Sequence, residues 1–113
     1  DCIIVDDMID TAGTLCKAAN QLKGTEVDVI DNSIVAKRVF AFASHGLFSK
    51  AANSHITESV LEQVVVLNTI PLSAQSKENP KIVQLSVAPL LADAIRAIHG
   101  KQSVSQIFDE GKQ

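Results

Sequence analysis

Carboxylates and small polar residues gather in a short segment near the start of the chain. Carboxylate oxygens suit sugar hydroxyls and hydrated Mg²⁺, whereas glycine and hydroxyl groups beside a helix N-terminus suit a phosphate group. Free backbone N–H groups and the positive end of the helix dipole hold an anion at such a position. The segment comprises Asp6, Asp7, Asp10, Thr11, Ala12, Gly13 and Thr14. These residue types predict a phosphate site beside a sugar or metal site.

Two elements must position this segment, a strand before it and a helix after it. The apolar, β-prone run Cys2–Val5 predicts a buried strand that ends in Asp6 and Asp7. A helix is predicted over 11–22, because apolar residues recur there at helical spacing on one face. Neighbouring side chains diverge on a strand, so the two carboxylates cannot chelate one ion face to face. One can reach ribose hydroxyls or a hydrated Mg²⁺ while the other orients it or caps the loop.

A simpler interpretation is that one acid, Asp7 or Asp10, only caps the helix that begins near Thr11. The complete order of strand, paired acids, small-residue turn and helix favours a functional loop over a cap alone. The segment lacks the Gly-Lys-Ser/Thr ending of a nucleotide P-loop, which excludes an ATP-cradling loop of that type. It also lacks the Gly-x-Gly-x-x-Gly fingerprint of dinucleotide-binding proteins.

The composition is that of one intracellular globular domain. The chain has 113 residues, of which 46% are hydrophobic and 20% charged, enough for one core but not for two lobes around a cleft. A net charge of −3 gives no electrostatic argument for nucleic acid or an anionic membrane as a partner. No apolar run approaches the roughly 20 residues of a membrane span, and no secretory signal is visible. We expect a cytoplasmic protein with Cys2 and Cys16 reduced.

The remaining patterns predict a small α/β domain with a parallel sheet and flanking helices. The apolar runs are mostly continuous rather than alternating, which favours parallel strands covered on both faces. The predicted strands are Cys2–Val5, Val39–Ala43, Val64–Leu67 and Ile82–Leu85, and further helices are predicted over 49–56 and 87–98. We expect an exposed loop at Ser73–Pro80. The long connection Gly24–Lys37 alternates well enough at 27–31 for a short strand or surface flap.

Three histidines and a serine-containing tail are further candidates. His45 lies in a Ser-His-Gly turn, but no second His or Cys stands at metal-ligand spacing, which favours a hydrogen-bonded turn residue. His55 and His99 have no catalytic neighbours in the sequence, and we expect them at the surface. Ser103 is predicted to cap a last short helix.

Five segments, in the same order, resemble one enzyme family. Val5–Thr14 is similar to the phosphoribosyl-diphosphate signature loop of the type I phosphoribosyltransferase superfamily. More narrowly, the chain resembles the ribose-phosphate pyrophosphokinases, also called phosphoribosyl-diphosphate synthetases. The other similar segments are Ala41–Ser49, Val65–Pro71, Leu85–Ile95 and Gln102–Phe108, whereas Gly24–Val35 resembles an insertion.

The resemblance implies transfer of a diphosphoryl group from Mg-ATP to the C1 hydroxyl of ribose 5-phosphate, which gives phosphoribosyl diphosphate and AMP. It implies that the loop holds the 5-phosphate and that the acidic pair contacts ribose hydroxyls and Mg²⁺. The loop residues are Asp10, Thr11, Ala12, Gly13 and Thr14, and the acidic pair is Asp6 and Asp7. In regulated members, residues matching Ser103, Val104 and Ser105 line an allosteric phosphate or ADP site. The family's usual hexamers, which are built of dimers, imply a homo-oligomer.

The resemblance also implies that residues 1–113 are the C-terminal part of such an enzyme, within a phosphoribosyltransferase-like domain. The family's ATP-binding half and its basic catalytic loop match nothing in the chain, so we assign no catalytic residue. No Lys or Arg occurs in the loop segment, which leaves charge on the transferred group without a cationic partner. We therefore expect the 113-residue chain alone to bind ribose 5-phosphate weakly and to have no synthetase activity.

Three alternatives stay open at this point. The chain can come from a non-catalytic, synthetase-associated regulatory subunit, although such proteins typically have a degraded signature loop. It can belong to a base-transferring phosphoribosyltransferase, which shares the loop but not the Ser-His-Gly turn or the Gln-Ser-Val-Ser tail. It can also be a stable assembly piece without activity of its own.

Overall fold

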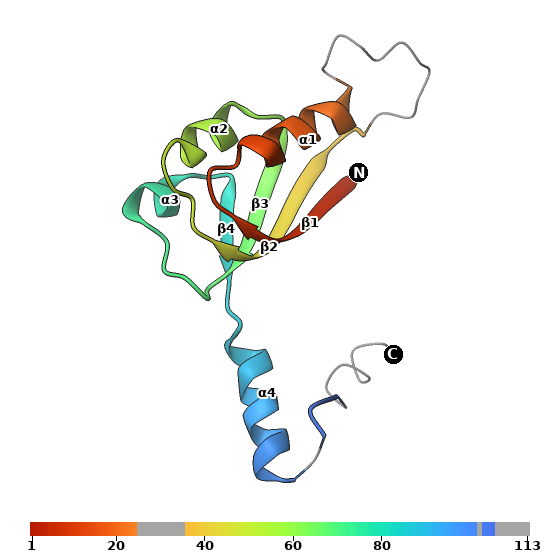
Figure 1. The fold of residues 1–113 in the computed structure, drawn as a ribbon, viewed down its shortest axis with the longest axis vertical. Coiled ribbons are helices and arrows are strands. Elements are labelled where there is room, and N and C mark those ends of the chain that lie inside the picture. The colour runs from red at the N-terminus through yellow and green to blue at the C-terminus, as the bar shows by residue number, and fades with distance from the viewer. Residues whose placement is uncertain (25–35, 102, 106–113) are drawn as a thin grey trace.

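The computed structural model describes residues 1–24, 36–101 and 103–105, in which strands and helices alternate (Figure 1). The strands are β1 (Cys2–Ile9), β2 (Val39–Gly46), β3 (Leu61–Leu67) and β4 (Ile82–Leu85). The helices are α1 (Gly13–Lys23), α2 (Ala52–Glu58), α3 (Ala74–Glu78) and α4 (Ala88–His99). Every predicted strand is therefore confirmed, apart from the one considered at 27–31, which lies outside the described residues.

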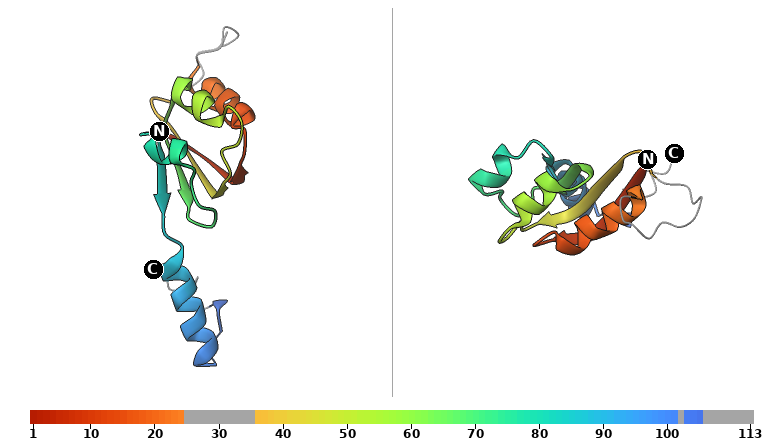
Figure 2. Two further views of the ribbon diagram at one scale, coloured as in Figure 1. Left: turned by 90° about the vertical axis from the view of Figure 1, so that its left-hand side faces the viewer. Right: turned by 90° about the horizontal axis from the view of Figure 1, so that it is seen from above.

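The four strands form one parallel sheet in the order β1-β2-β3-β4, which confirms the α/β class. Pairing runs from Cys2 opposite Val39 to Ile9 opposite Gly46, and β3 pairs in parallel with both β2 and β4. Consecutive strands are neighbours and parallel crossovers are right-handed, so each connecting helix passes over the same face. Figure 2 shows α1 and α2 together on that side of the sheet.

The core lies between this face and the helices. In β2 the inward side chains are Val39, Ala41 and Ala43, all buried. Their small size lets the helices approach the sheet closely, and tight packing of this kind is what a core needs. The other fully buried apolar residues of this layer include Val64, Val66, Ala19 and Ile56.

The opposite face of the sheet is apolar, and among the described residues no helix covers it. Ile3 and Val5 are 67% and 72% exposed, and the register places them beside Phe40 and Phe42. The same face continues across the sheet through Val65, Val83, Leu67 and Leu85. The continuous apolar runs led us to expect cover on both faces, and in the described part of the chain only one face is covered.

The structure differs from the predictions at the end of the first strand and at Ser73–Pro80. The first strand does not end at the acids, because β1 runs through Asp6 and Asp7 to Ile9 and stays paired with β2. The predicted loop Ser73–Pro80 contains the five-residue helix α3. The Ser73 hydroxyl caps α3 by accepting from the Ser76 N–H at 3.2 Å, and Ser76 is buried.

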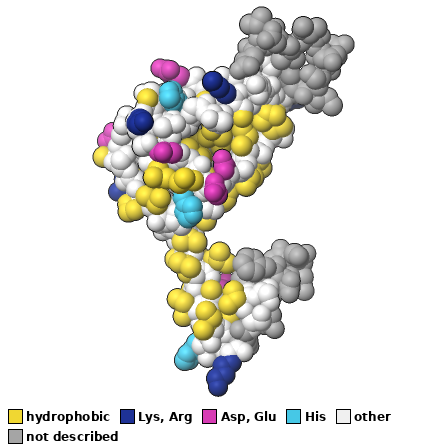
Figure 3. Space-filling model, in the orientation of Figure 1, with side chains coloured by type: hydrophobic (Ala, Val, Ile, Leu, Met, Phe, Trp, Pro, Cys, Tyr) yellow, Lys and Arg dark blue, Asp and Glu magenta, His cyan; other side chains and the backbone are white. Residues whose placement is uncertain are grey.

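The last helix is confirmed and stands apart from the sheet (Figure 1). α4 has Pro89 in its first turn and ends before Gly100, as predicted. Its apolar residues Leu91, Ile95 and Ile98 are exposed, and Figure 3 shows hydrophobic side chains over much of its visible side. α4 therefore takes no part in positioning the segment at 6–14.

We expect Gly46→Ala to destabilise the fold by about 1–3 kcal/mol, because a methyl group there overpacks the core. The new Cβ would lie 2.5 Å from Cε2 of Phe48 and 3.0 Å from Cγ1 of Val66, and both neighbours are buried. The measurement is urea-induced unfolding. Gly100→Ala is the control, since its Cβ would lie 3.4 Å from the Arg96 carbonyl oxygen. Equal midpoints for wild type and Gly46→Ala would contradict this packing.

Candidate functional site

The turn between β1 and α1 leaves backbone N–H groups free at the start of the helix. Ala12 has φ 67° and ψ 5°, the left-handed conformation, and α1 begins at Gly13. The first helical bond runs from the Cys16 N–H to the Ala12 carbonyl oxygen, at 3.0 Å. The N–H groups of residues 13–15 therefore have no partner inside the helix, and Ala12 supplies no side-chain cap. Together with the helix dipole, these donors favour an anion.

The predicted segment surrounds a cavity of about 200 Å³. Six of its residues line the cavity, namely Asp6, Asp10, Thr11, Ala12, Gly13 and Thr14, together with Met8, Ile9 and Leu15. Asp7 is not among the lining residues. Its N–H donates to Asp6 Oδ1 at 2.8 Å. A Cβ added at Gly13 would meet no atom within 4 Å, so the backbone there borders open space.

Two residues to which the sequence assigned no role hold this segment in place. Ser49, in the turn after β2, donates its N–H to the Asp10 carbonyl oxygen at 3.1 Å. The Ser49 hydroxyl also donates to the Asp10 carboxylate. His55, on α2, has Nδ1 2.9 Å from the Thr11 carbonyl oxygen. The loop is thus fixed from two sides by segments that follow β2.

Sequence spacing gave no signal for these contacts. Ser49 lies 39 residues from Asp10, and His55 lies 44 residues from Thr11. His55 is exposed, as we expected, yet its ring contacts the loop. A usable signal was the predicted parallel pairing itself, because parallel neighbours end at the same edge of a sheet and the segments after them must meet there.

Acidic charge dominates the lining of this cavity. Asp6 and Asp10 line it, and its lining residues include no Lys, Arg or His. A phosphate there depends on backbone N–H groups and threonine hydroxyls as donors, and a cation beside it would reduce repulsion from the acids. Among the described residues, no group of three or more His, Cys, Asp or Glu side chains is placed to hold a metal ion. One or two carboxylates still suit Mg²⁺, which keeps bound waters and takes further ligands from substrate phosphates.

The Cys16 thiol lies where α1 meets α2. Its Sγ donates to the His55 carbonyl oxygen at 3.4 Å. Burial raises the pKa of this thiol above its ordinary value of 9.0, against smaller opposing effects of the Ser59 hydroxyl and the Lys81 charge. The thiol therefore stays protonated and acts as a donor between the two helices. Cys2 is also a free cysteine.

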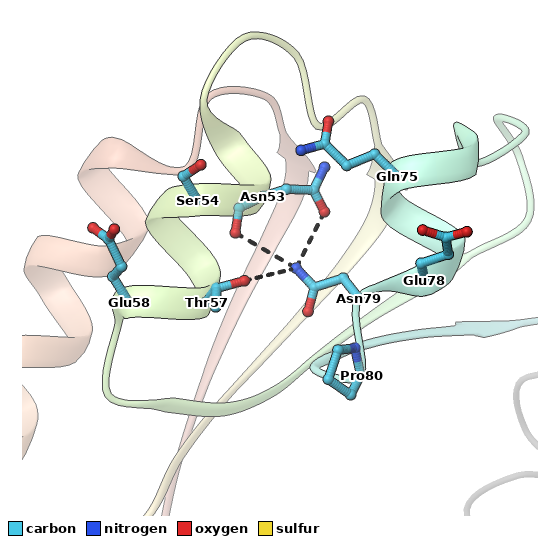
Figure 4. A pocket seen from close by; sticks show the side chains of 8 residues that line it. All are labelled: Asn53, Ser54, Thr57, Glu58, Gln75, Glu78, Asn79 and Pro80. Atoms are coloured by element: carbon cyan, nitrogen blue, oxygen red, sulfur yellow. Dashed lines mark hydrogen bonds between the residues drawn. The ribbon is translucent and has the colours of Figure 1, made fainter.

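A larger cavity, of about 330 Å³, lies between α2 and α3 and shares no lining residue with the first. Figure 4 shows Asn79 in its wall with the amide directed at Asn53 and Thr57. Asn79 Nδ2 lies 3.1 Å from Asn53 Oδ1 and 3.3 Å from Thr57 Oγ1, and Asn79 Oδ1 accepts from the Lys81 N–H at 3.0 Å. Both asparagines are buried and paired, so this network joins α2 to the start of β4.

His45 and the serine tail have local partners. His45 Nδ1 lies 2.7 Å from Thr69 Oγ1, which confirms the predicted hydrogen bonding. The predicted turn is wrong, because His45 lies within β2 and pairs with Met8 of β1. Ser103 Oγ accepts from the Ser105 N–H at 3.3 Å, whereas the short helix predicted to follow extends outside the described residues. The allosteric phosphate or ADP site implied at these serines remains a prediction.

Known proteins are similar to this chain in sequence and in fold. A family profile described as "Phosphoribosyl synthetase-associated domain" matches residues 2–109. The chain belongs to this family. It is 47% identical over 108 residues to a ribose-phosphate pyrophosphokinase of Shewanella oneidensis, and 48% identical over 109 residues to one of Vibrio cholerae. The solved phosphoribosylpyrophosphate synthetase of Mycobacterium smegmatis has a similar fold, with a TM-score of 0.72 at 39% identity.

These matches cover most of this chain but only part of each relative. They include 96% of this chain but 31% and 32% of the two pyrophosphokinases. For the solved synthetase the shares are 88% of this chain and 30% of that one. The chain thus spans about a third of the length of these relatives. Over its described residues, no helix has the length and apolar character needed to cross a membrane.

We expect Asn79→Ala to lower the free energy of unfolding by about 1–3 kcal/mol, because it leaves buried polar partners without a hydrogen bond. The partners are the Asn53 amide oxygen and the Lys81 N–H. Urea unfolding measures the loss. Gln75→Ala is the matched control from the same cavity wall, since Gln75 is exposed, and it should change stability by less than about 0.5 kcal/mol. A stable Asn79→Ala protein would refute the structural role of the network.

We expect the free energy of unfolding to fall as pH rises above about 9, the ordinary thiol pKa of 9.0. Because its pKa is raised, the Cys16 thiol of the folded chain keeps its proton at a pH at which the unfolded chain has lost it. Rising pH therefore favours the unfolded state and lowers the free energy of unfolding. Chemical unfolding at a series of pH values measures the slope. Cys16→Ala should flatten it, whereas Cys2→Ala should not. An unchanged slope in Cys16→Ala would show that this thiol is not responsible.

Proposed function

We propose that the loop binds the phosphate of ribose 5-phosphate as part of a ribose-phosphate pyrophosphokinase. Such an enzyme transfers a diphosphoryl group from Mg-ATP to the C1 hydroxyl of the sugar and releases AMP. The observation that supports this most directly is the cavity of about 200 Å³ at the N-terminus of α1, lined by the predicted loop. The names of the curated relatives point to the same chemistry.

In this proposal the 5-phosphate accepts hydrogen bonds from the free N–H groups at the start of α1 and from the hydroxyls of Thr11 and Thr14. Ala12 and Gly13 contribute backbone alone, which lets the anion approach closely. Asp10 serves the phosphate through the shape of the loop, because its carboxylate already accepts from Ser49. A direct contact between Asp10 and phosphate would bring like charges together.

We assign the sugar and metal contacts first to Asp6. Its carboxylate lines the same cavity as the loop, so it can accept from ribose hydroxyls or bind Mg²⁺. Asp7 has a supporting role, because it is absent from the cavity lining. When bound, Mg²⁺ would neutralise charge on the phosphate oxygens. Phosphoryl-type transfer needs positioning and charge neutralisation rather than a protein nucleophile, and this chain's part is to position the acceptor sugar.

We further propose that ATP binds mainly through regions of the relatives that this chain does not cover, and that the chain acts as the C-terminal part of a homo-oligomer. The alternative is a synthetase-associated subunit that keeps the fold without the site. The loop supports the first proposal, a ligand-binding part of an enzyme, because its acids, its hydroxyls and the free N–H groups of α1 meet at one cavity.

We expect Thr14→Asp to weaken binding of ribose 5-phosphate by roughly tenfold or more, because the new carboxylate repels the phosphate at the helix N-terminus. The fold should be kept, since an acid in the first turn of a helix is favourable. Titration followed by backbone amide NMR signals detects even weak binding.

Ser54→Asp is the matched control, because it adds the same charge in the first turn of α2 instead of α1. It should bind as wild type does. Equal affinities for Thr14→Asp and Ser54→Asp would place the phosphate elsewhere. A longer relative that exchanges a nucleobase with phosphoribosyl diphosphate, and not ATP with ribose 5-phosphate, would favour a base-transferring enzyme.

A further inference from the structure

His55 contacts the loop through the Thr11 carbonyl group. Its Nδ1 lies 2.9 Å from the Thr11 carbonyl oxygen, and this bond joins α2 to the β1–α1 turn. A carbonyl oxygen can only accept, so the His55 proton must be on Nδ1 in this contact. The backbone of His55 is fixed as well, because its carbonyl accepts from Cys16 Sγ at 3.4 Å and its N–H donates to the Ala51 carbonyl oxygen at 2.9 Å.

The Thr11 carbonyl shares a rigid unit with the Ala12 N–H. The peptide group is planar and trans, so its C=O and N–H point in opposite directions. Directing the Thr11 carbonyl toward α2 therefore turns the Ala12 N–H away from α2. Both residues line the loop cavity. The direction of this one peptide decides whether a donor or an acceptor faces an anion at the start of α1.

Contacts from outside the loop are needed to maintain its backbone conformation. Ala12 has φ 67°, a left-handed conformation that is sterically unfavourable for a residue with a Cβ. A strained conformation persists only where surrounding contacts determine it. Ser49 fixes the chain at Asp10, and His55 is the next contact along the loop. Ala12, the strained residue, comes directly after Thr11 in the chain.

We infer that His55 is a positioning residue for the phosphate loop. Its Nδ1–H holds the Thr11 carbonyl so that the Ala12 N–H, with the free N–H groups of α1, faces the phosphate. His55 acts through the loop and touches no ligand. The inference rests on the proposed function for the identity of the anion, but the loop geometry that it requires can be measured without any ligand.

The test compares three substitutions at one position. His55→Asn keeps a donor on the atom bonded to Cγ, where Nδ1 stands, whereas His55→Gln moves the amide one bond farther and His55→Ala removes it. We expect the His55→Ala and His55→Gln variants to bind inorganic phosphate and ribose 5-phosphate roughly three- to tenfold more weakly than wild type. The Asn variant should stay within about twofold of wild type, as should His99→Asn on α4.

Ligand-free NMR spectra separate this inference from the proposed function. The amide signals of Ala12 and Gly13 should move in His55→Ala and His55→Gln and return in His55→Asn, and the wild-type ring proton should be on Nδ1. Unmoved signals in a folded His55→Ala protein, or equal losses in the Asn and Gln variants, would overturn the inference. If wild type binds neither ligand, the proposed function fails, and the amide signals alone then decide the role of His55.

Discussion

Parallel pairing of β1 with β2 is the constraint on which the candidate site depends. It brings both carboxyl ends to the same edge of the sheet, so the segments that follow the two strands lie side by side. The β1–α1 turn is then tied at Asp10 to Ser49 of the next turn. Farther along the same edge, His45 contacts Thr69 in the segment after β3. The site is held by the order of the strands more than by the loop's own sequence.

Ala12 shows how packing and backbone geometry combine at this turn. A glycine would adopt the left-handed conformation without a steric cost, whereas alanine needs compensation. Ala12 is buried in the hydrophobic core cluster, so its methyl group gains favourable burial that offsets part of the strain. In return, the sharp turn lets the chain leave β1 and enter α1 without a side chain over the first N–H groups.

Local patterns predicted much of this molecule because they act over a few residues. Apolar runs identified the strands, and Ile82–Leu85 was predicted with its observed ends. Residue types at 6–14 indicated the loop, six of whose residues line one cavity. Distant contacts explain what was missed. The buried Ser76 of α3 bonds to Asn53, which is 23 residues away, and β1 continues past its acids because pairing with β2 decides where it ends.

The strand order links the exposed apolar face of the sheet to the position of the loop, because β1 is an edge strand. Among the described residues β1 pairs only with β2, so its other edge has unpaired backbone groups, and the loop stands at the end of an edge strand. A parallel strand added along that edge would reverse the strand order at β1. Its right-handed crossover would then pass over Ile3 and Val5, on the face that α1 and α2 leave bare. The loop would become the switch point of a doubly wound sheet, the place where such sheets bind their ligands.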